Sequence, residues 1–133
     1  IIKINKITVI NDSYNANLES VKSGVKDLIS LSSSNRRIVV LGDMLELGKL
    51  ETRHHKILGE YLSNKNIDTI FGYGNLISHT INSINNTRIT KKYYNDQDTL
   101  INDLKKYLKN GDYIYIKGSR GMKMENIIKK LKN

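Results

Sequence analysis

Strand-like and helix-like segments alternate along this 133-residue chain, and the alternation constrains the fold more than any other feature of the sequence. Short apolar segments at residues 7–10, 38–41, 69–71, 92–94 and 113–116 are predicted strands. Between them apolar residues recur at helical spacing, as in Leu18, Val21, Val25 and Leu28. Strands that alternate with helices need crossover connections. We therefore predict a three-layer, Rossmann-like α/β fold, in which a mainly parallel sheet has helices on both faces.

The ends of these elements also carry signals. Residues 2–4 and the turn at Asn5 and Lys6 predict an antiparallel hairpin at one edge of the sheet. Polar residues suitable as helix caps precede three predicted helices: Asn17, Asn75, and Asp96 or Asp98. The sequence contains no low-complexity linker and no internal repeat, so we expect residues 1–133 to form a single domain.

The composition excludes several classes of protein. With 38% hydrophobic and 26% charged residues the chain is typical of a globular domain, and its apolar runs are too short to span a bilayer. The net charge is +9, but the lysines are scattered over every segment. This favours a solvated basic surface over a nucleic-acid site. The absence of cysteine permits a reducing cytosol, where we expect the protein to be located.

Polar side chains and glycines gather after the predicted strands, at residues 11–17, 42–48, 72–75 and 117–121. In an open parallel sheet these segments share the carboxyl edge, where ligands bind. The first segment offers groups for hydrogen bonding and for stacking against a nucleotide: Asp12, Tyr14, Asn15 and Asn17. An Asx-rich turn with Asn17 as a helix cap explains the same residues without a ligand.

The last of these segments suits an anion. Lys117, Ser119 and Arg120 combine two cations with a hydroxyl group, and we expect free backbone amides beside them at a helix start. This pattern predicts a carboxylate or phosphate site. A plain helix entry with exposed basic residues is the alternative.

Two other patterns predict no site. Residues 42–49 resemble a phosphate loop, but five residues separate the glycines instead of four, and Leu50 follows where that loop carries a hydroxyl. His54, His55 and His79 lack the convergent partners of a metal site. We expect solvated or packing histidines and no metal site in this chain.

Three segments in order resemble one protein family. Asp12–Asn17, Leu41–Gly48 and Lys117–Met122 are similar to motifs of the C-terminal domain of Mur ligases, in the forms found in the member that adds D-alanyl-D-alanine. The resemblance runs over essentially the whole chain. One departure is Leu18, where the family usually has proline in the first helical turn. We expect a slightly softer helix entry there and unchanged chemistry.

The resemblance implies a three-domain, ATP-dependent ligase of peptidoglycan synthesis. Such an enzyme joins D-alanyl-D-alanine to UDP-N-acetylmuramoyl-tripeptide through an acyl phosphate. The chain begins at Ile1 within a strand-like pattern and without an initiator methionine, so we expect a piece of a longer polypeptide. The implied partners are the N-terminal and central domains of that polypeptide, and we expect a monomer without nucleic-acid or membrane partners. The phosphate loop and the Mg²⁺ ligands would lie outside this chain, which is therefore expected to contain no catalytic residue and to be inactive alone.

The resemblance also implies roles for individual residues. Those near the nucleotide are Asp12, which would contact the ribose or the terminal phosphates, and Tyr14, Asn15 and Asn17 in the same cleft. Those in the D-alanyl-D-alanine pocket are Asp43, Lys117, Ser119 and Arg120. Arg120 is the expected partner of the terminal carboxylate, because a guanidinium group binds a carboxylate in a bidentate manner.

Two other functions compete with the ligase. The first is a free-standing Rossmann-like module that binds a nucleotide or an anion at the carboxyl edge. The second is a nucleic-acid-binding domain that uses the positive net charge. A phosphate loop encoded upstream of Ile1 would favour the ligase, and salt-dependent retention of DNA would favour the nucleic-acid-binding domain.

Overall fold

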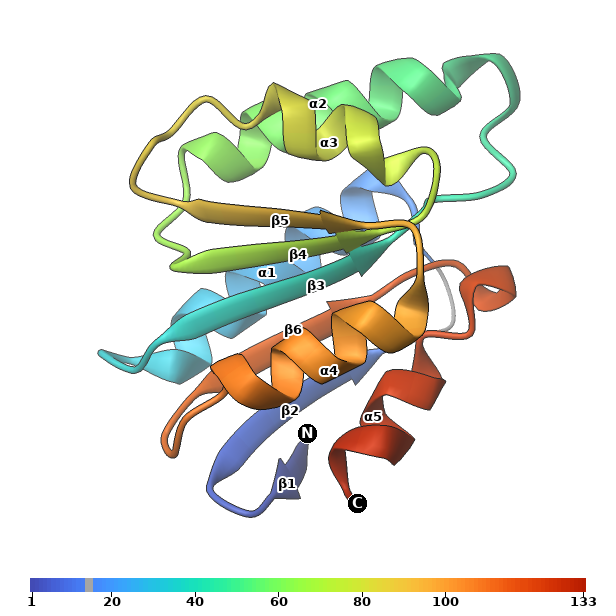
Figure 1. Cartoon of the computed structure of the whole chain (residues 1–133). Coiled ribbons are helices and arrows are strands. Elements are labelled where there is room, and N and C mark those ends of the chain that lie inside the picture. Colours follow the sequence, from blue (N-terminus) through green and yellow to red (C-terminus); the bar gives the residue numbers. More distant parts are fainter. Residues whose placement is uncertain (14–15) are drawn as a thin grey trace.

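A computed structural model describes residues 1–13 and 16–133 of the chain. The described residues form a six-stranded sheet in the order β1-β2-β6-β3-β4-β5 (Figure 1). The strands are β1 (Ile2–Ile4), β2 (Ile7–Asp12), β3 (Arg37–Gly42), β4 (Thr69–Tyr73), β5 (Thr90–Tyr94) and β6 (Tyr113–Lys117). β1 pairs antiparallel with β2, and the other neighbouring strands are parallel. The predicted parallel sheet and its edge hairpin are confirmed.

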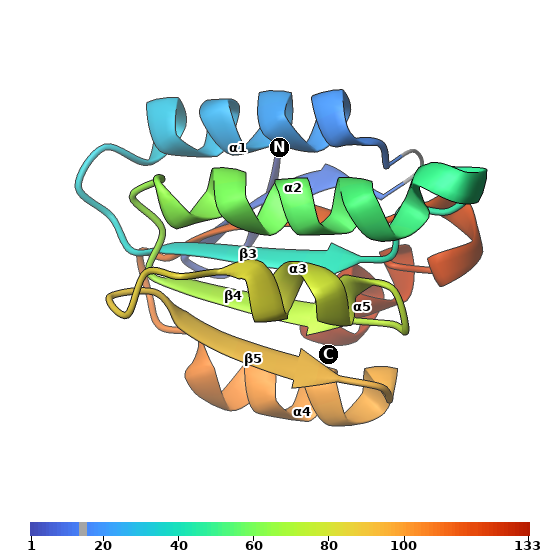
Figure 2. The ribbon, with the colours of Figure 1, turned by 90° about the horizontal axis from the view of Figure 1, so that it is seen from above.

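Helices cover both faces of this sheet. They are α1 (Leu18–Ser32), α2 (Glu51–Ser63), α3 (Ile77–Ser83), α4 (Gln97–Tyr107) and α5 (Glu125–Leu131), with single 3₁₀ turns η1 (Gly48–Leu50) and η2 (Arg120–Met122). Figure 2 shows α1, α2 and α3 on one face, and α4 and α5 on the other. The three-layer architecture is therefore confirmed. Within the described part of the chain, no helix has the length and apolar character needed to cross a membrane.

The sheet separates two apolar clusters. Val39 and Leu41 pack in the cluster on the side of α1, α2 and α3. Ile38 and Val40 point to the opposite side and pack in the cluster with α4 and α5. This alternation follows from the two-residue period of a strand, and it makes every residue of β3 buried. Each fully buried aliphatic side chain contributes about 1.5–3 kcal/mol, so the two clusters hold the layers together.

Side-chain caps fix two helix starts, as expected. Asn17 Oδ1 accepts a hydrogen bond from the Ser20 amide at 2.9 Å at the start of α1, an interaction generally worth about 1 kcal/mol. Asp96, rather than Asp98, caps α4 in the same way. Leu18, at the position of the family's proline, is the first residue of α1 and packs against the core.

The cap predicted at Asn75 is wrong. The capping position of α3 is Leu76, which has no side-chain cap. The Ile77 amide at the start of this helix donates instead to Asp43 Oδ1 at 2.8 Å. The reason is tertiary: β3 and β4 are neighbours, so the loop after β3 brings a carboxylate to the unsatisfied amides at the start of α3.

Candidate functional site

The carboxyl ends of the central strands bring the predicted site segments together. β6 lies between β2 and β3, and in the parallel register Lys117 pairs with both Asp12 and Leu41. Segments that lie about a hundred residues apart in the sequence are therefore neighbours at one edge of the sheet.

Asp12 and Lys117 form an ion pair at this edge, with 2.5 Å between Lys117 Nζ and Asp12 Oδ2. The Lys117 side chain is 2% exposed, whereas that of Asp12 is 45% exposed. The Tyr115 hydroxyl also donates to Asp12 Oδ2, at 3.5 Å. Burial, together with the nearby Asp12 charge, raises the pKa of Tyr115 well above its ordinary value, so this group stays a proton donor. A buried ammonium group needs such a counterion, and Asp12 is the acceptor that the structure provides.

The loop after β3 is anchored through three consecutive residues. Asp43 is buried and caps α3, as described above. The Met44 amide donates to His55 Nε2 at 3.0 Å. The Leu45 amide donates to Ser119 Oγ at 2.8 Å. The loop thus contacts α3, α2 and the segment after β6, so its conformation is set by the surrounding elements.

His55 occupies the interior behind this loop. Its side chain is fully buried, and Nδ1 lies 2.6 Å from the Glu51 carbonyl oxygen. Burial lowers the pKa of His55 below its ordinary value of 6.5. The prediction of a packing histidine is confirmed for this residue.

The predicted helix start at residues 117–120 is wrong. β6 extends to Lys117, a single 3₁₀ turn follows at Arg120–Met122, and α5 begins only at Glu125. The Ser119 amide, expected to be free, donates to the Asp43 carbonyl oxygen at 3.1 Å. The backbone of this segment is held by the loop after β3, because the two loops leave neighbouring strands.

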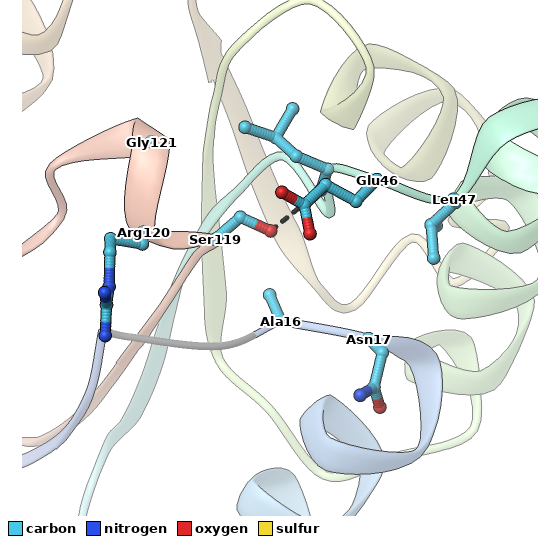
Figure 3. A pocket seen from close by; sticks show the side chains of 8 residues that line it. Ala16, Asn17, Glu46, Leu47, Ser119, Arg120 and Gly121 are labelled. Atoms are coloured by element: carbon cyan, nitrogen blue, oxygen red, sulfur yellow. Dashed lines mark hydrogen bonds between the residues drawn. The ribbon is translucent and has the colours of Figure 1, made fainter.

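A cavity of about 510 Å³ opens between these loops (Figure 3). Its lining residues come from the start of α1, the loop after β3 and the segment after β6: Ala16, Asn17, Leu45, Glu46, Leu47, Ser119, Arg120 and Gly121. Glu46 supplies a carboxylate and Arg120 a guanidinium group, and the lining also includes a hydroxyl, an amide and apolar side chains. A cavity of this composition can hold a small zwitterion that has apolar side groups.

The structure brings together only part of the predicted site. Asn17, Ser119 and Arg120 line the cavity. Asp12 and Lys117, predicted to contact different ligands, are partners of each other. Asp43 is buried against α3 and is not among the lining residues. Tyr14 and Asn15 lie outside the described residues.

Glu46 is the charged lining residue that was not predicted from the sequence. Its φ of 65° is in the left-handed region, which a non-glycine residue rarely adopts, and Gly48 follows with a φ of 58°. The tight loop turns Glu46 toward the cavity between Leu45 and Leu47. The sequence pattern that could have indicated this residue is its position between Leu45 and Leu47, with Gly48 directly after them. In the described part of the chain, no group of three or more His, Cys, Asp or Glu side chains gathers around one point.

Comparison with known proteins identifies relatives along nearly the whole chain. Residues 1–120 match the family described as the glutamate ligase domain of Mur ligases. The UDP-N-acetylmuramoyl-tripeptide–D-alanyl-D-alanine ligase of Bacillus subtilis is 37% identical over 129 residues, which cover 94% of this chain and 28% of that ligase. The enzyme of the same name from Buchnera aphidicola is 38% identical, over 98% of this chain and 28% of its own length. The chain thus spans about 28% of the length of these curated relatives.

Solved structures show the same fold. A MurF ligase from Thermotoga maritima, in complex with ADP, superposes with a TM-score of 0.81 at 23% identity. The match covers 98% of this chain and 29% of that protein. MurF from Acinetobacter baumannii also gives a TM-score of 0.81, at 25% identity and with the same coverage.

Proposed function

The chain belongs to the Mur ligase family, because residues 1–120 match its glutamate ligase domain. We propose that the chain is the C-terminal domain of a ligase that joins D-alanyl-D-alanine to UDP-N-acetylmuramoyl-tripeptide. Residues 1–133 would form one of three domains, and the N-terminal and central domains of the same polypeptide would be its partners. The relatives named for this reaction support the ligase over a free-standing nucleotide-binding module.

The observation that carries this proposal is the chemistry of the cavity. D-alanyl-D-alanine has a carboxylate at one end, an amine at the other and two methyl groups between them. Arg120 would bind the carboxylate, and Glu46, which lines the cavity from the loop after β3, would hold the amine. Ser119 and Asn17 offer hydrogen bonds to the peptide group, and Leu45 and Leu47 offer apolar contacts for the methyl groups.

Of the residues predicted to line the D-alanyl-D-alanine pocket, two have new roles in this proposal. Lys117 would act through Asp12, because its ammonium group is buried against that carboxylate. Asp43 would act by holding the loop that carries Glu46. Neither side chain lines the cavity.

The nucleotide would lie at the same edge of the sheet. The Asp12 side chain is 45% exposed and can accept hydrogen bonds from a ribose. Asn17, at the start of α1, would take part in the same cleft. A structural neighbour in complex with ADP supports ATP as the cofactor. We propose that the phosphate loop and the Mg²⁺ ligands belong to the central domain, and that Tyr14 and Asn15 complete the nucleotide cleft.

In this proposal the domain would contribute to the reaction without a catalytic residue of its own. ATP would activate the tripeptide carboxylate as an acyl phosphate, and the amine of the dipeptide would attack it. Closure of this domain over the nucleotide would bring the dipeptide to the acyl phosphate and exclude water, which would otherwise hydrolyse it. We place the enzyme in the cytoplasm as a monomer.

The test is a ligation assay with the whole polypeptide that carries the chain. With ATP, Mg²⁺ and UDP-N-acetylmuramoyl-tripeptide, D-alanyl-D-alanine should give a product heavier by the dipeptide less one water, with one phosphate released. L-alanine, D-glutamate and meso-diaminopimelate are the control acceptors. Product formation with one of these controls and not with D-alanyl-D-alanine would contradict the proposal.

A further inference from the structure

The loop Asp43–Leu47 forms one wall of the cavity, and three of its residues are hydrogen-bonded to three different elements. The bond at Asp43 uses a carboxylate, and the one at Leu45 uses the Ser119 hydroxyl. The bond at Met44 uses His55, whose imidazole ring can gain a proton as the pH falls. This anchor therefore differs from the other two in its response to pH.

The hydrogen bonds of His55 define the form of its ring. The Glu51 carbonyl oxygen can only accept, so Nδ1 carries the proton and donates to it. The Met44 amide can only donate, so Nε2 must be unprotonated and accept. A second proton would be placed on Nε2, directly opposite the Met44 amide hydrogen. Protonation and the bond to Met44 are therefore mutually exclusive.

The groups that surround the ring come from each element packed against it. Asp43, in the loop, favours the charged form of His55, as does Glu51 on its own helix, whereas His79 on α3 disfavours it. Burial outweighs these charges and lowers the pKa of His55. The balance keeps the ring neutral, and the loop anchored, at neutral pH.

We propose that His55 is a positioning residue for the cavity: its neutral imidazole holds the Asp43–Leu47 loop through the Met44 amide, and its protonation releases that loop. Glu46, two residues beyond Met44, is the cavity group that moves with the loop. The anchoring follows from the contacts alone. The effect on D-alanyl-D-alanine rests on the proposed function.

The anchoring is tested by NMR spectroscopy of the whole polypeptide, labelled with ¹⁵N at methionine amides and histidine rings. A Met44→Leu variant identifies the Met44 amide signal. In the unmodified protein, this signal should shift with pH at the same midpoint as the His55 ring nitrogens. His55→Gln replaces Nε2 with an amide oxygen that accepts but does not titrate, so the Met44 amide should stay protected and lose its pH dependence.

Two further variants complete the design. His55→Leu leaves the Met44 amide without an acceptor, and its hydrogen-exchange protection should fall about tenfold or more at every pH, the loss expected for one buried hydrogen bond. His54→Gln, at the neighbouring residue, should change neither signal nor protection. A Met44 amide that is unaffected by His55 titration, or equally protected in His55→Leu, would overturn the proposal.

The consequence for the ligand is measured separately. The KM for D-alanyl-D-alanine should rise at acidic pH in the unmodified enzyme, and His55→Gln should abolish this rise while the KM for ATP is unchanged. If the NMR results hold and this KM shows no such dependence, the loop anchor stands and the assignment of the cavity to the dipeptide is contradicted.

Discussion

The structure predicts that removal of the Asp12 carboxylate lowers the stability of the folded chain. Asp12→Ala deletes the counterion of Lys117, whose side chain is 2% exposed. The ammonium group cannot reach water without local rearrangement, so the folded state would hold an uncompensated charge. Breaking a buried ion pair from one side costs about 3–5 kcal/mol. Because water already reaches the half-exposed Asp12, we expect the lower end of this range.

The opposite truncation is the matched control. Lys117→Met keeps most of the volume of the buried side chain and removes its charge. It leaves Asp12, which is 45% exposed and can be hydrated, so the expected cost is about 1 kcal/mol or less. The two variants thus delete the same ion pair with different penalties. The double variant, which has no buried charge at this position, should be more stable than Asp12→Ala alone.

Urea unfolding of the 133-residue chain, followed by circular dichroism, measures these differences. In thermal unfolding, the same loss of about 3 kcal/mol would lower the Tm by roughly 10 °C for a domain of this size. Equal losses in Asp12→Ala and Lys117→Met would refute the reasoning. So would a double variant no more stable than Asp12→Ala, because the penalty would then not come from the buried ammonium group.

Three further predictions concern the folded chain. Gly24→Ala should lower the free energy of unfolding in urea by about 1–3 kcal/mol, because the added methyl group would overlap the Tyr115 hydroxyl. Its control, Ser23→Ala on the exposed side of α1, should be neutral or stabilising. Burial lowers the pKa of His55 in the folded state, so the unfolded chain takes up the proton first as the pH falls. The free energy of unfolding should therefore be unaffected by His55 above about pH 6.5 and should fall below that pH by up to about 1.4 kcal/mol per pH unit. This slope should be smaller in His55→Gln. An equal slope in His55→Gln would mean that the ring is already protonated in the folded state. The isolated chain should release no phosphate from ATP, and measurable release with pure protein would contradict the assignment of the phosphate loop to another domain.

The fold was largely predictable from local patterns, but the order of the strands was not. Short apolar segments located the strands β2 to β6, and residues 2–4 with the turn at Asn5 and Lys6 located the edge hairpin. That β6 lies between β2 and β3 depends on which helix faces pack together, and no local pattern encodes this. The wrong cap at Asn75 has the same origin, because Asp43 reaches α3 only after β3 and β4 have become neighbours.

The cavity lies at the edge of the sheet where the site was predicted, but only some of the predicted side chains line it. Asn17 and Arg120 line the cavity, as their positions in the loops suggested. Asp12 and Lys117 were predicted to contact different ligands. Their pairing was missed because it follows from the register of β2 and β6, which connects distant parts of the chain. Glu46 was missed because its direction depends on a left-handed backbone conformation.

The most direct test of the proposed function is the KM for D-alanyl-D-alanine in the whole polypeptide with Arg120→Ala. Loss of a guanidinium–carboxylate contact should raise this KM by about tenfold or more, with the KM for ATP unchanged. Arg120→Lys should recover part of the loss, and Lys129→Ala, an exposed position on α5, should have no effect. An unchanged KM for D-alanyl-D-alanine in Arg120→Ala would contradict the assignment of this cavity to the dipeptide.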